Sequence, residues 1–405
     1  MWAFFDDRLA FVESCARSGD SVFVRFGPRR ALVLSHPELV REVFVHEAKH
    51  FIRGITGKPM RSLLGEGLLL SEGEVWRRQR REVQPMFASD GVARWTPSIE
   101  AATDALVARW RDGERRDIHH EMHRLTLDIA ARLFLGVESD ERDRLHPALE
   151  ATLGEDLFGN AIPLGAFRWP MRQAGKATEL ERLVEERIAD AERGRVAPFI
   201  ARLAESAKDR REVRDQIMTL IFTSQDTTAV ALTWLWHLVS RDERAECVLR
   251  DEAMRSQTTP QTRPYLTAVF NETMRLFPPV VGQAREAARA CEIGNASVRP
   301  GDLVMFSQWV IHRDPRWFDK PESFMPERWE DGFEDRLHPF AYFPFGGGRR
   351  VCVGRTLALA IAATVVPSIL RRYRLVATSE RRPDLHTVVT PRPKGGLPME
   401  LRRLD

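Results

Sequence analysis

The residue best placed to do chemistry is Cys352, which ends a run of glycines and arginines inside the segment Phe345–Gly354. Glycine permits backbone shapes and close approaches that a Cβ would prevent. Cys352 also directly precedes an expected helix at Arg355–Leu370, whose unpaired N–H groups and dipole stabilise a thiolate. A thiolate with backbone donors suits metal ligation, and cysteine is a known axial ligand of heme iron. Arg350, two residues earlier, is suited to pairing with an anionic cofactor group.

A polar block interrupts the longest apolar stretch of the chain, Ile217–Ser240. Residues Thr223–Thr228 read Thr-Ser-Gln-Asp-Thr-Thr. A bilayer would penalise this block heavily, so a buried helix is expected rather than a membrane span. Local rules fail most often at functional sites, and a hydroxyl can both donate and accept a proton. An acidic, hydroxyl-rich run inside an apolar helix is therefore a candidate functional segment.

Two charged motifs have helical spacing. Glu272 and Arg275 are three residues apart and can pair on one helix face, although an exposed pair of this kind contributes little to stability. Trp76 and Arg80 are four residues apart and also share a face. For the second motif, a basic helix with a buried tryptophan is the simpler interpretation.

The elements that position these residues are mostly helical. Apolar residues recur at three- and four-residue spacing from Gly73 to Arg275, whereas short strand-like runs follow Pro278 and Pro279. The expected strands are Ser21–Phe26, Ala31–Leu34, Leu303–Phe306 and pieces of Pro391–Leu401, and the clearest helices are one from Pro37, Leu125–Leu135, Leu180–Ala191, Val213–Ser240 and Arg355–Leu370. The sequence predicts one mainly α domain over residues 1–405, with a small β region from both chain ends.

Composition narrows the class of protein. The 405 residues are 43% hydrophobic and 29% charged, and the net charge of +3 gives no reason to expect a nucleic-acid partner. The four cysteines are widely spaced without a Cys-x-x-Cys pair, which fits a reducing compartment and excludes the usual zinc clusters. Residues 1–20 show no signal peptide. We therefore expect a cytoplasmic protein without a membrane span.

The cysteine segment resembles the heme-binding loop of the cytochrome P450 family. The matching positions are Phe345, Gly348, Arg350, Cys352 and Gly354. The resemblance implies the cytochrome P450 fold, a heme b cofactor with Cys352 as its iron ligand, and oxygen activation opposite the thiolate. It covers nearly the whole chain, because further landmarks follow in the family's order.

These landmarks imply structural and cofactor-binding roles. Glu272 and Arg275 resemble the family's Glu-x-x-Arg motif, and with Arg328 they are implied to form a buried ionic network beneath the cysteine loop. Three other residues are implied to contact the heme propionates, namely Trp76, Arg80 and Arg285. Tryptophan at the first of these positions looks closer to the branch that resembles fatty-acid hydroxylases.

The polar block resembles the family's oxygen-activating segment. Asp226 and Thr227 match its acid–alcohol pair, which implies that they deliver protons during catalysis. The chain departs from the pattern at Thr223 and Ser224, where the family usually has Ala-Gly. Ser224 is expected to narrow the groove that glycine leaves open, or to add a hydrogen bond there.

Three function classes are open. The first is a monooxygenase that hydroxylates or epoxidises an apolar small molecule with O2, either in specialised-metabolite biosynthesis or in fatty-acid oxidation. The second is a heme-thiolate enzyme that does not use O2, such as a peroxygenase, isomerase or dehydratase. The third is a non-catalytic heme-binding or gas-sensing protein. Asp226 and Thr227 favour the first class, because the other two need no proton relay.

The electron donor is expected to be a separate protein. The sequence shows no cysteine cluster and no dinucleotide-binding glycine motif, so a ferredoxin or flavodoxin with its NAD(P)H reductase is implied. A basic docking face and generic surface charge are equally good interpretations of Arg77, Arg78, Arg81, Arg349 and Arg355. The segments Phe51–Leu70 and Ala161–Trp169 match positions that line the family's substrate chamber. We expect a monomer.

Overall fold

The computed structural model describes residues 7–26, 28–137, 174–195, 198–255, 263–387 and 390–404. The chain divides into two units, each built from segments distant in sequence. Unit 1 comprises Met1–Thr56, Val230–Cys352 and Ala377–Leu397, and unit 2 comprises Gly57–Ala229, Val353–Val376 and Pro398–Asp405. The cysteine loop thus belongs to unit 1, whereas the polar block belongs to unit 2.

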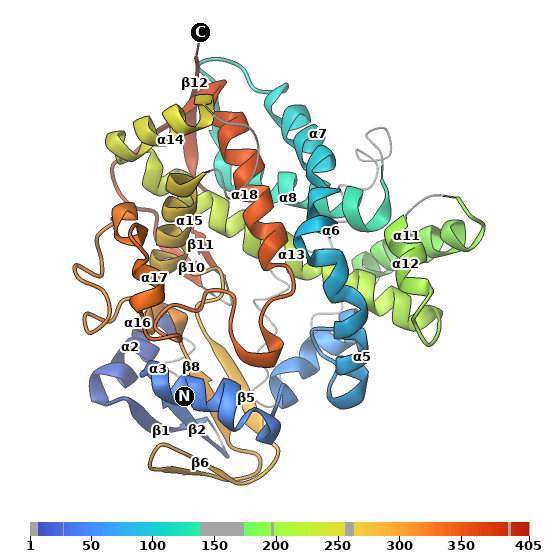
Figure 1. The fold of residues 1–405 in the computed structure, drawn as a ribbon, viewed down its shortest axis with the longest axis vertical. Helices are drawn as coiled ribbons and strands as arrows, with labels where there is room; N and C mark the ends of the chain where they lie inside the picture. The colour runs from blue at the N-terminus through green and yellow to red at the C-terminus, as the bar shows by residue number, and fades with distance from the viewer. Residues whose placement is uncertain are drawn as a thin grey trace. The chain divides into compact units, whose positions relative to one another are not determined.

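Unit 1 contains a five-stranded sheet in the order β1-β2-β8-β5-β3 (Figure 1). Its strands are β1 (Ser21–Phe26), β2 (Arg29–Leu34), β3 (Phe51–Ile52), β5 (Gln283–Ala287) and β8 (Leu303–Phe306). Strands β1 and β2 form an antiparallel hairpin, and β2 pairs in parallel with β8 from Ala31↔Leu303 to Leu34↔Phe306. The sheet therefore combines strands from residues 21–52 with strands from residues 283–306, which confirms the expected β region built from distant parts of the chain.

Short helices and two hairpins complete unit 1. The helices are α2 (Arg8–Ser18), α3 (Pro37–Arg41), the π-helix η1 (Glu42–His46), η2 (Ala48–His50), α14 (Glu243–Arg255), α15 (Pro264–Leu276), α16 (Gln308–Ile311), η7 (Pro326–Trp329), α17 (Phe333–Arg336) and η8 (Gly348–Arg350). The hairpins pair β6 (Cys291–Ile293) with β7 (Ala296–Val298) and β10 (Leu385–Thr387) with β11 (Pro391–Pro393). Proline occupies the first turn of α3 and of α15, where its missing N–H costs no hydrogen bond.

Aromatic side chains pack the core of unit 1. Phe44 stacks on Phe340 at 5.5 Å between ring centroids and meets the edge of Phe306 at 5.0 Å. In a second cluster, Trp234 and Phe277 lie parallel, with centroids 4.0 Å apart. Buried aromatic pairs of this kind each contribute about 0.5–1.5 kcal/mol beyond their area. The first of these clusters lies directly against the cysteine loop.

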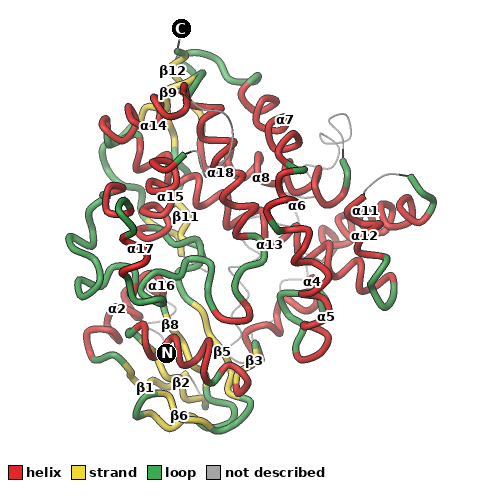
Figure 2. The backbone as a smooth tube through the Cα atoms, in the orientation of Figure 1, coloured by secondary structure: helices red, strands yellow, loops and turns green. Residues whose placement is uncertain are grey.

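Unit 2 is mainly helical (Figure 2). Its elements are α4 (Arg61–Leu64), α5 (Gly73–Val83), η4 (Gln84–Phe87), α6 (Ser89–Ala93), α7 (Thr96–Val107), α8 (Ile118–Leu135), α11 (Ala174–Glu192), α12 (Pro198–Ala204), α18 (Arg355–Leu370) and the small sheet of β4 (Arg115–Asp117), β12 (Pro398–Arg403) and β9 (Tyr373–Ala377). The 3₁₀-helix η3 (Gly54–Met60) and the long helix α13 (Arg210–Val239) both cross the division between the units.

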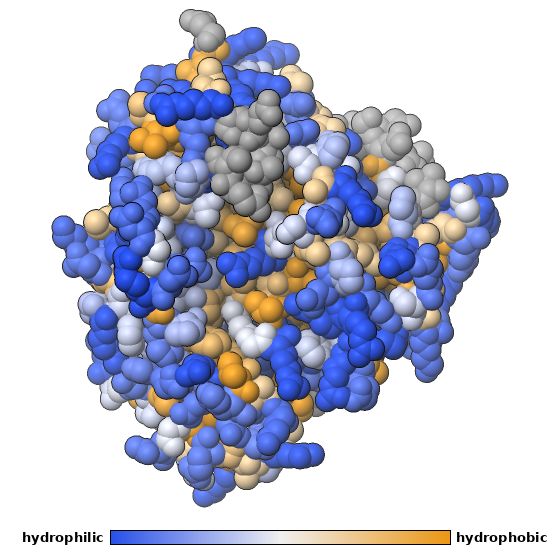
Figure 3. All heavy atoms as spheres, viewed as in Figure 1, coloured by the Kyte–Doolittle hydropathy of each residue, from blue (hydrophilic) through white to orange (hydrophobic). Residues whose placement is uncertain are grey.

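Helix α13 runs without interruption through the polar block, as expected. Within the described ranges, no helix combines the length and apolarity that crossing a bilayer requires. In the view of Figure 3, hydrophilic residues cover most of the surface and hydrophobic ones form scattered small areas. The mainly helical fold expected from the sequence is therefore confirmed.

Candidate active site

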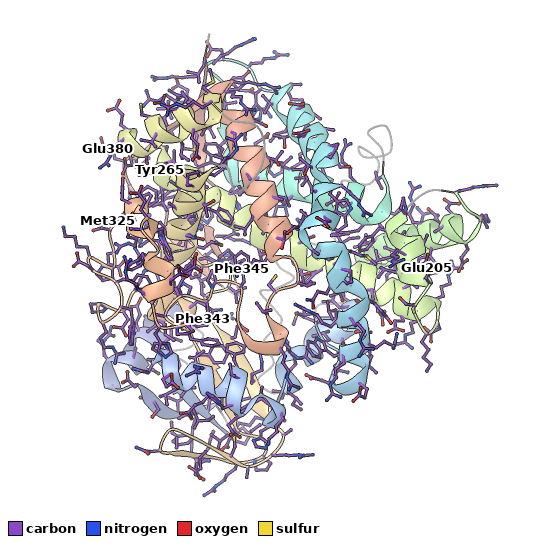
Figure 4. All side chains as sticks on the ribbon, in the orientation of Figure 1. Glu205, Tyr265, Met325, Phe343, Phe345 and Glu380 are labelled. Carbon is purple, nitrogen blue, oxygen red and sulfur yellow. The ribbon has the colours of Figure 1, made fainter. Side chains whose placement is uncertain are left out.

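The cysteine loop of unit 1 presents Cys352 as an exposed thiol. The Cys352 N–H donates to the carbonyl of Phe345 at 2.9 Å, and the Gly346 N–H donates to the carbonyl of Phe343 at 2.9 Å (Figure 4 labels both phenylalanines). Gly354, the cap residue of α18, has its φ at −83°, so no glycine-specific backbone shape is needed there. Two backbone hydrogen bonds thus set the path that leads to the sulfur.

The glycine run is required by shape and by close packing. Gly346 and Gly348 have φ values of +72° and +61°, in the left-handed region that L side chains rarely adopt. A Cβ at Gly348 would lie 2.2 Å from the carbonyl oxygen of Phe44, and one at Gly347 would lie 2.3 Å from the ring of Phe340. The prediction that these glycines serve a tight backbone approach is confirmed.

Phe44 supports this loop, although nothing in the sequence singled it out. It lies in the π-helix η1, and single π-helical turns are frequent at functional sites. Besides its ring contacts in the core, it lies beneath the guanidinium of Arg285, whose Cζ is 5.4 Å from the ring centroid. One side chain therefore contacts the loop, the sheet and an arginine expected to bind a cofactor.

Glu272 is the centre of the ionic network expected beside the loop. It has no exposed surface, and neither has Arg275. Arg275 donates to both carboxylate oxygens of Glu272 at 2.8 Å, and Arg328 Nε donates to Oε1 at 3.1 Å. The Met325 N–H and the Trp329 indole N–H complete the set at 3.0 and 2.8 Å. The three charged residues do form the expected buried network, and Trp329 is a partner that the sequence did not reveal.

His312 connects the network to the cysteine loop. Its carbonyl accepts from Arg275 at 3.0 Å, and its Nε2 accepts from the Phe343 N–H at 3.0 Å. The ring is fully buried, and burial followed by the charges of Arg275 and Arg313 lowers its pKa well below the ordinary value. A neutral imidazole therefore holds the start of the loop.

Two arginines of unit 1 lie near the cysteine loop. Arg285 is 6% exposed in β5 and donates to its own strand at Ala284 and Gln283. A Cβ on Gly346 would lie 3.6 Å from the Gln283 amide nitrogen, so this end of β5 lies beside the loop. Arg350 is half-buried in η8. The propionate contact expected of Arg285 and the pairing of Arg350 with an anionic cofactor group stay predictions.

Helix α5 of unit 2 carries the other expected cofactor residues. Trp76 and Arg80 are both half-buried, and Arg80 donates to Gln84 at 3.1 Å. Gln79 between them is buried and donates to Glu212 at 2.8 Å, which ties α5 to the beginning of α13. The structure shows that Trp76 and Arg80 share the helix but leaves their ligand untested.

One member of the expected basic face is engaged elsewhere. Arg78 donates to both oxygens of Glu212 at 2.7 and 2.9 Å. Burial raises the pKa of Glu212, but hydrogen bonds from Arg78 and from neighbouring N–H groups outweigh burial and leave that pKa below its ordinary value. A donor protein would have to break this pair to use Arg78, so that residue is removed from the proposed face.

The polar block places its hydroxyls on one face of α13. Thr223, Ser224 and Thr227 are half-buried, while Asp226 and Thr228 are buried. The Thr227 hydroxyl donates to the Thr223 carbonyl at 3.0 Å, and the Ser224 hydroxyl donates to the Ile221 carbonyl at 3.2 Å. The hydroxyls of Ser224 and Thr227 thus donate to carbonyls of their own helix, on residues that are only half-buried.

Gln225 is a member of this block that sequence reasoning passed over. It is 1% exposed, and its amide nitrogen lies 2.7 Å from Nε2 of His123 on α8. Because this contact joins α8 to α13 one residue before Asp226, it fixes the rotation of the helix at the candidate proton-transfer residue. The only sign of this role in the sequence was an amide side chain inside an otherwise apolar helix.

Comparison with known proteins decides the family. The family model described as "Cytochrome P450" matches residues 8–399. The chain belongs to the cytochrome P450 family. It is therefore an enzyme of the monooxygenase class.

Curated and solved cytochromes P450 match nearly the full chain. Cyclooctatin synthase of Streptomyces melanosporofaciens is 32% identical over 414 residues, covering 96% of this chain and 89% of that protein. Cyclooctat-9-en-7-ol 5-monooxygenase of the same organism is 32% identical, covering 91% and 85%. A six-coordinated cytochrome P450 from Thermus thermophilus has a TM-score of 0.79 at 26% identity, covering 97% of this chain and 98% of that one.

The segments expected to line the cytochrome P450 substrate chamber are only partly described. Residues 51–70 form β3, η3, α4 and the turns that follow, but they are divided between the two units. The segment Ala161–Trp169 lies outside the described residues. The expectation that these two segments line a substrate chamber therefore stays a prediction.

The ionic network predicts a large loss of stability in Glu272→Ala. Removing the carboxylate leaves Arg275 and Arg328 buried without their counter-charge, which typically costs ~3–5 kcal/mol. Asp384→Ala is the matched control, because Asp384 pairs with Arg381 at the same spacing but is 67% exposed. Exposed pairs contribute about 0–1 kcal/mol. Chemical denaturation measures both, and equal losses would contradict the buried-network interpretation.

The loop geometry predicts that Gly348→Ala destabilises the protein more than Gly301→Ala. Both glycines have positive φ, at +61° and +85°, so both variants bear about 1–2 kcal/mol of backbone strain. Only the Cβ at Gly348 meets an atom, because nothing lies within 4 Å at Gly301. Overpacking adds about 1–3 kcal/mol. The difference in unfolding free energy checks this, and the prediction fails if the two variants lose the same amount.

Proposed function

We propose that the protein is a heme-thiolate monooxygenase that binds heme b through Cys352 and inserts one oxygen atom of O2 into an apolar substrate. The observation that carries the proposal is the exposed Cys352 thiol at the end of a loop that Gly346, Gly348 and the Phe345 carbonyl shape. When bound, the heme supplies oxygen activation at its iron.

The residues present fit such a cofactor. Cys352 would supply a soft thiolate ligand to the iron, at the end of a loop whose backbone the glycines allow. Four residues would neutralise or orient the propionates, namely Trp76, Arg80, Arg285 and Arg350. Arg285 is buried beside the loop. Its guanidinium lies over the ring of Phe44, which fixes the position of this positive charge.

Proton transfer is assigned to Asp226 and Thr227. The Thr227 hydroxyl donates to the Thr223 carbonyl, so its own lone pairs remain available to accept. To pass a proton onward, the hydroxyl rotates away from that carbonyl. Ser224 shares the half-buried face and adds a second hydroxyl where the family usually has glycine. Asp226 is 2% exposed, so any proton it passes on must reach it through a neighbouring group or a bound water rather than directly from bulk solvent.

The substrate is proposed to be an apolar cyclic compound such as a terpene. The support is the printed name of a 32% identical relative, whose substrate is the unsaturated cyclic alcohol cyclooctat-9-en-7-ol. We also propose a role in the biosynthesis of a specialised metabolite. A fatty acid is the other substrate class that the sequence suggested, and a binding-spectrum series of both classes distinguishes them.

Electrons are proposed to come from a separate ferredoxin or flavodoxin with its NAD(P)H reductase, in the cytoplasm. None of the four cysteines forms a disulfide bond, which suits a reducing compartment. The exposed cations of this face are Arg77, Arg81, Arg349 and Arg355, of which Arg77 pairs with Glu74 on its own helix. Turnover reconstituted with each donor class tests this choice.

Thiolate ligation predicts a spectroscopic change in Cys352→Ala. The reduced parent protein with carbon monoxide is expected to show the red-shifted Soret band that is typical of a thiolate ligand, and the variant is expected to lose it. Cys247→Ala is the control, because Cys247 is also exposed but lies on α14. Retention of the band in Cys352→Ala would refute the assignment of the ligand.

The proton relay predicts uncoupled turnover in Thr227→Ala. Substrate-induced spectral shifts are expected to persist, while product formation falls by about a hundred- to ten-thousand-fold. Thr227→Ser keeps the hydroxyl and is expected to keep most of the product yield. Ser224→Gly is expected to leave coupling unchanged or improve it.

The measured quantity is product formed per NAD(P)H consumed. Equal coupling in Thr227→Ala and the parent would mean that this hydroxyl carries no proton for O2 chemistry. If peroxide alone also supported full turnover, a peroxygenase would be the better assignment. Turnover without either oxidant would indicate an isomerase or dehydratase.

A further inference from the structure

Glu47, His50 and Cys291 bring three different metal-ligating atoms together in unit 1, away from the cysteine loop. One carboxylate oxygen, one imidazole nitrogen and the thiol sulfur lie within 4.8 Å of one another. The His50 Nδ1 atom is 2.5 Å from Glu47 Oε2. Among the described residues, no other group of three or more His, Cys, Asp or Glu side chains meets this criterion.

The local backbone places Glu47 and His50 on one side. The π-helix η1 closes with the Glu47 N–H donating to the Glu42 carbonyl at 2.8 Å, and the next turn is the 3₁₀-helix η2. Its His50 N–H donates to the Glu47 carbonyl at 2.8 Å. In a 3₁₀ turn the side chains at i and i+3 eclipse, so these two side chains point the same way.

Cys291 is held against this pair by independent contacts. The Ala288 N–H donates to the His50 carbonyl at 2.8 Å, which fixes the chain three residues before the cysteine. The Gly294 N–H, in the turn of the β6–β7 hairpin, donates to the Glu42 carboxylate at 2.7 Å. The hairpin also buries side chains in the aromatic core of unit 1, namely Ile293, Ala296 and Val298. Hydrogen bonds and core packing therefore hold the backbone at all three residues in place.

We propose that Glu47, His50 and Cys291 form a binding site for a zinc-like divalent cation, with water as the fourth ligand. Cysteine sulfur, histidine nitrogen and carboxylate oxygen are the donor types that tetrahedral Zn²⁺ takes. Tetrahedral ligation at about 2.0–2.3 Å separates the ligand atoms by about 3.3–3.6 Å. Glu47 and His50 would therefore move apart, and Cys291 would move closer, by about 1 Å each. Hard cations such as Mg²⁺ and Ca²⁺ prefer oxygen donors alone.

The accessibility of the site suits exchange with solvent. The side chains of His50 and Glu47 are 19% and 30% exposed, so an ion can enter and a water can complete its shell. The ion would join the chain around residue 50 to a hairpin more than two hundred residues later, and its binding stabilises the folded state by mass action.

Two other interpretations of these residues are weaker. Residues 46–50 read His-Glu-Ala-Lys-His, the spacing of a zinc-protease motif, but that motif needs both histidines on one α-helical face. Here His46 ends a π-helix, is exposed and lies outside the cluster. A reactive thiol is disfavoured as well, because Cys291 is half-buried beside the carboxylate of Glu47 rather than exposed beside a cation.

Zinc binding to the heme-loaded full chain tests the proposal. After treatment with a chelator, the protein is titrated with Zn²⁺ against a chromophoric competitor, and bound zinc and iron are counted separately by mass spectrometry. We expect one zinc per chain and a higher melting temperature with zinc. X-ray absorption at the zinc edge is expected to show one sulfur neighbour at about 2.3 Å.

The ligand variants are Cys291→Ser, His50→Ala and Glu47→Gln. Each is expected to weaken zinc binding by at least the ~10–100-fold that loss of an outer-shell partner causes. The controls are Cys247→Ser and Ser297→Ala, which alter an exposed cysteine of α14 and an exposed residue of the β6–β7 hairpin outside the cluster. The proposal is overturned if Cys291→Ser binds zinc like the parent. A zinc-edge spectrum of the parent without sulfur overturns it too, even if every variant fails to fold.

Discussion

Glu272 carries a charge at a position without solvent contact, and it stays stable there only because five donors surround it. Three reach Oε1 and two reach Oε2, from Arg275, Arg328, Met325 and Trp329. Removing such an ion from water is expensive, so its partners must all be in place at once. Helix α15, the turn η7 and the chain before it therefore assemble as one element, and that element gives the cysteine loop a fixed support.

The sequence predicted the parts of this protein in which local chemistry decides the outcome. The strand Leu303–Phe306 and the helix Arg355–Leu370 have the expected bounds, because periodic apolar residues and clear punctuation mark both. The glycines before Cys352 also predicted a tightly packed loop. The roles of Phe44 and His312 were not predicted, because they arise from contacts with residues distant in sequence. A pattern of residue types carries no information about such partners.

The same limit applies to charge. Arg78 looked like a free surface cation in the sequence, yet Glu212, more than a hundred residues later, accepts two hydrogen bonds from it. The polar block shows the converse. Its helical spacing was sufficient to place Ser224 and Thr227 on one face, because 3.6 residues per turn leave no freedom in the matter. What the pattern could not reveal is that Gln225 on the opposite side contacts His123 and so sets the rotation of α13.

The neutral state of His312 has a consequence for behaviour in acid. In the folded protein its pKa lies well below the ordinary value of 6.5, so the bond from the Phe343 N–H to Nε2 does not titrate near neutrality. The unfolded chain, by contrast, takes up a proton at this histidine as the pH falls below about 6.5. Acid therefore favours the unfolded state through His312 without first loosening the native contact. Mild acidification therefore leaves the hydrogen bond between His312 and Phe343 intact in the folded protein. The effect of acid through His312 appears only when the region around it unfolds cooperatively.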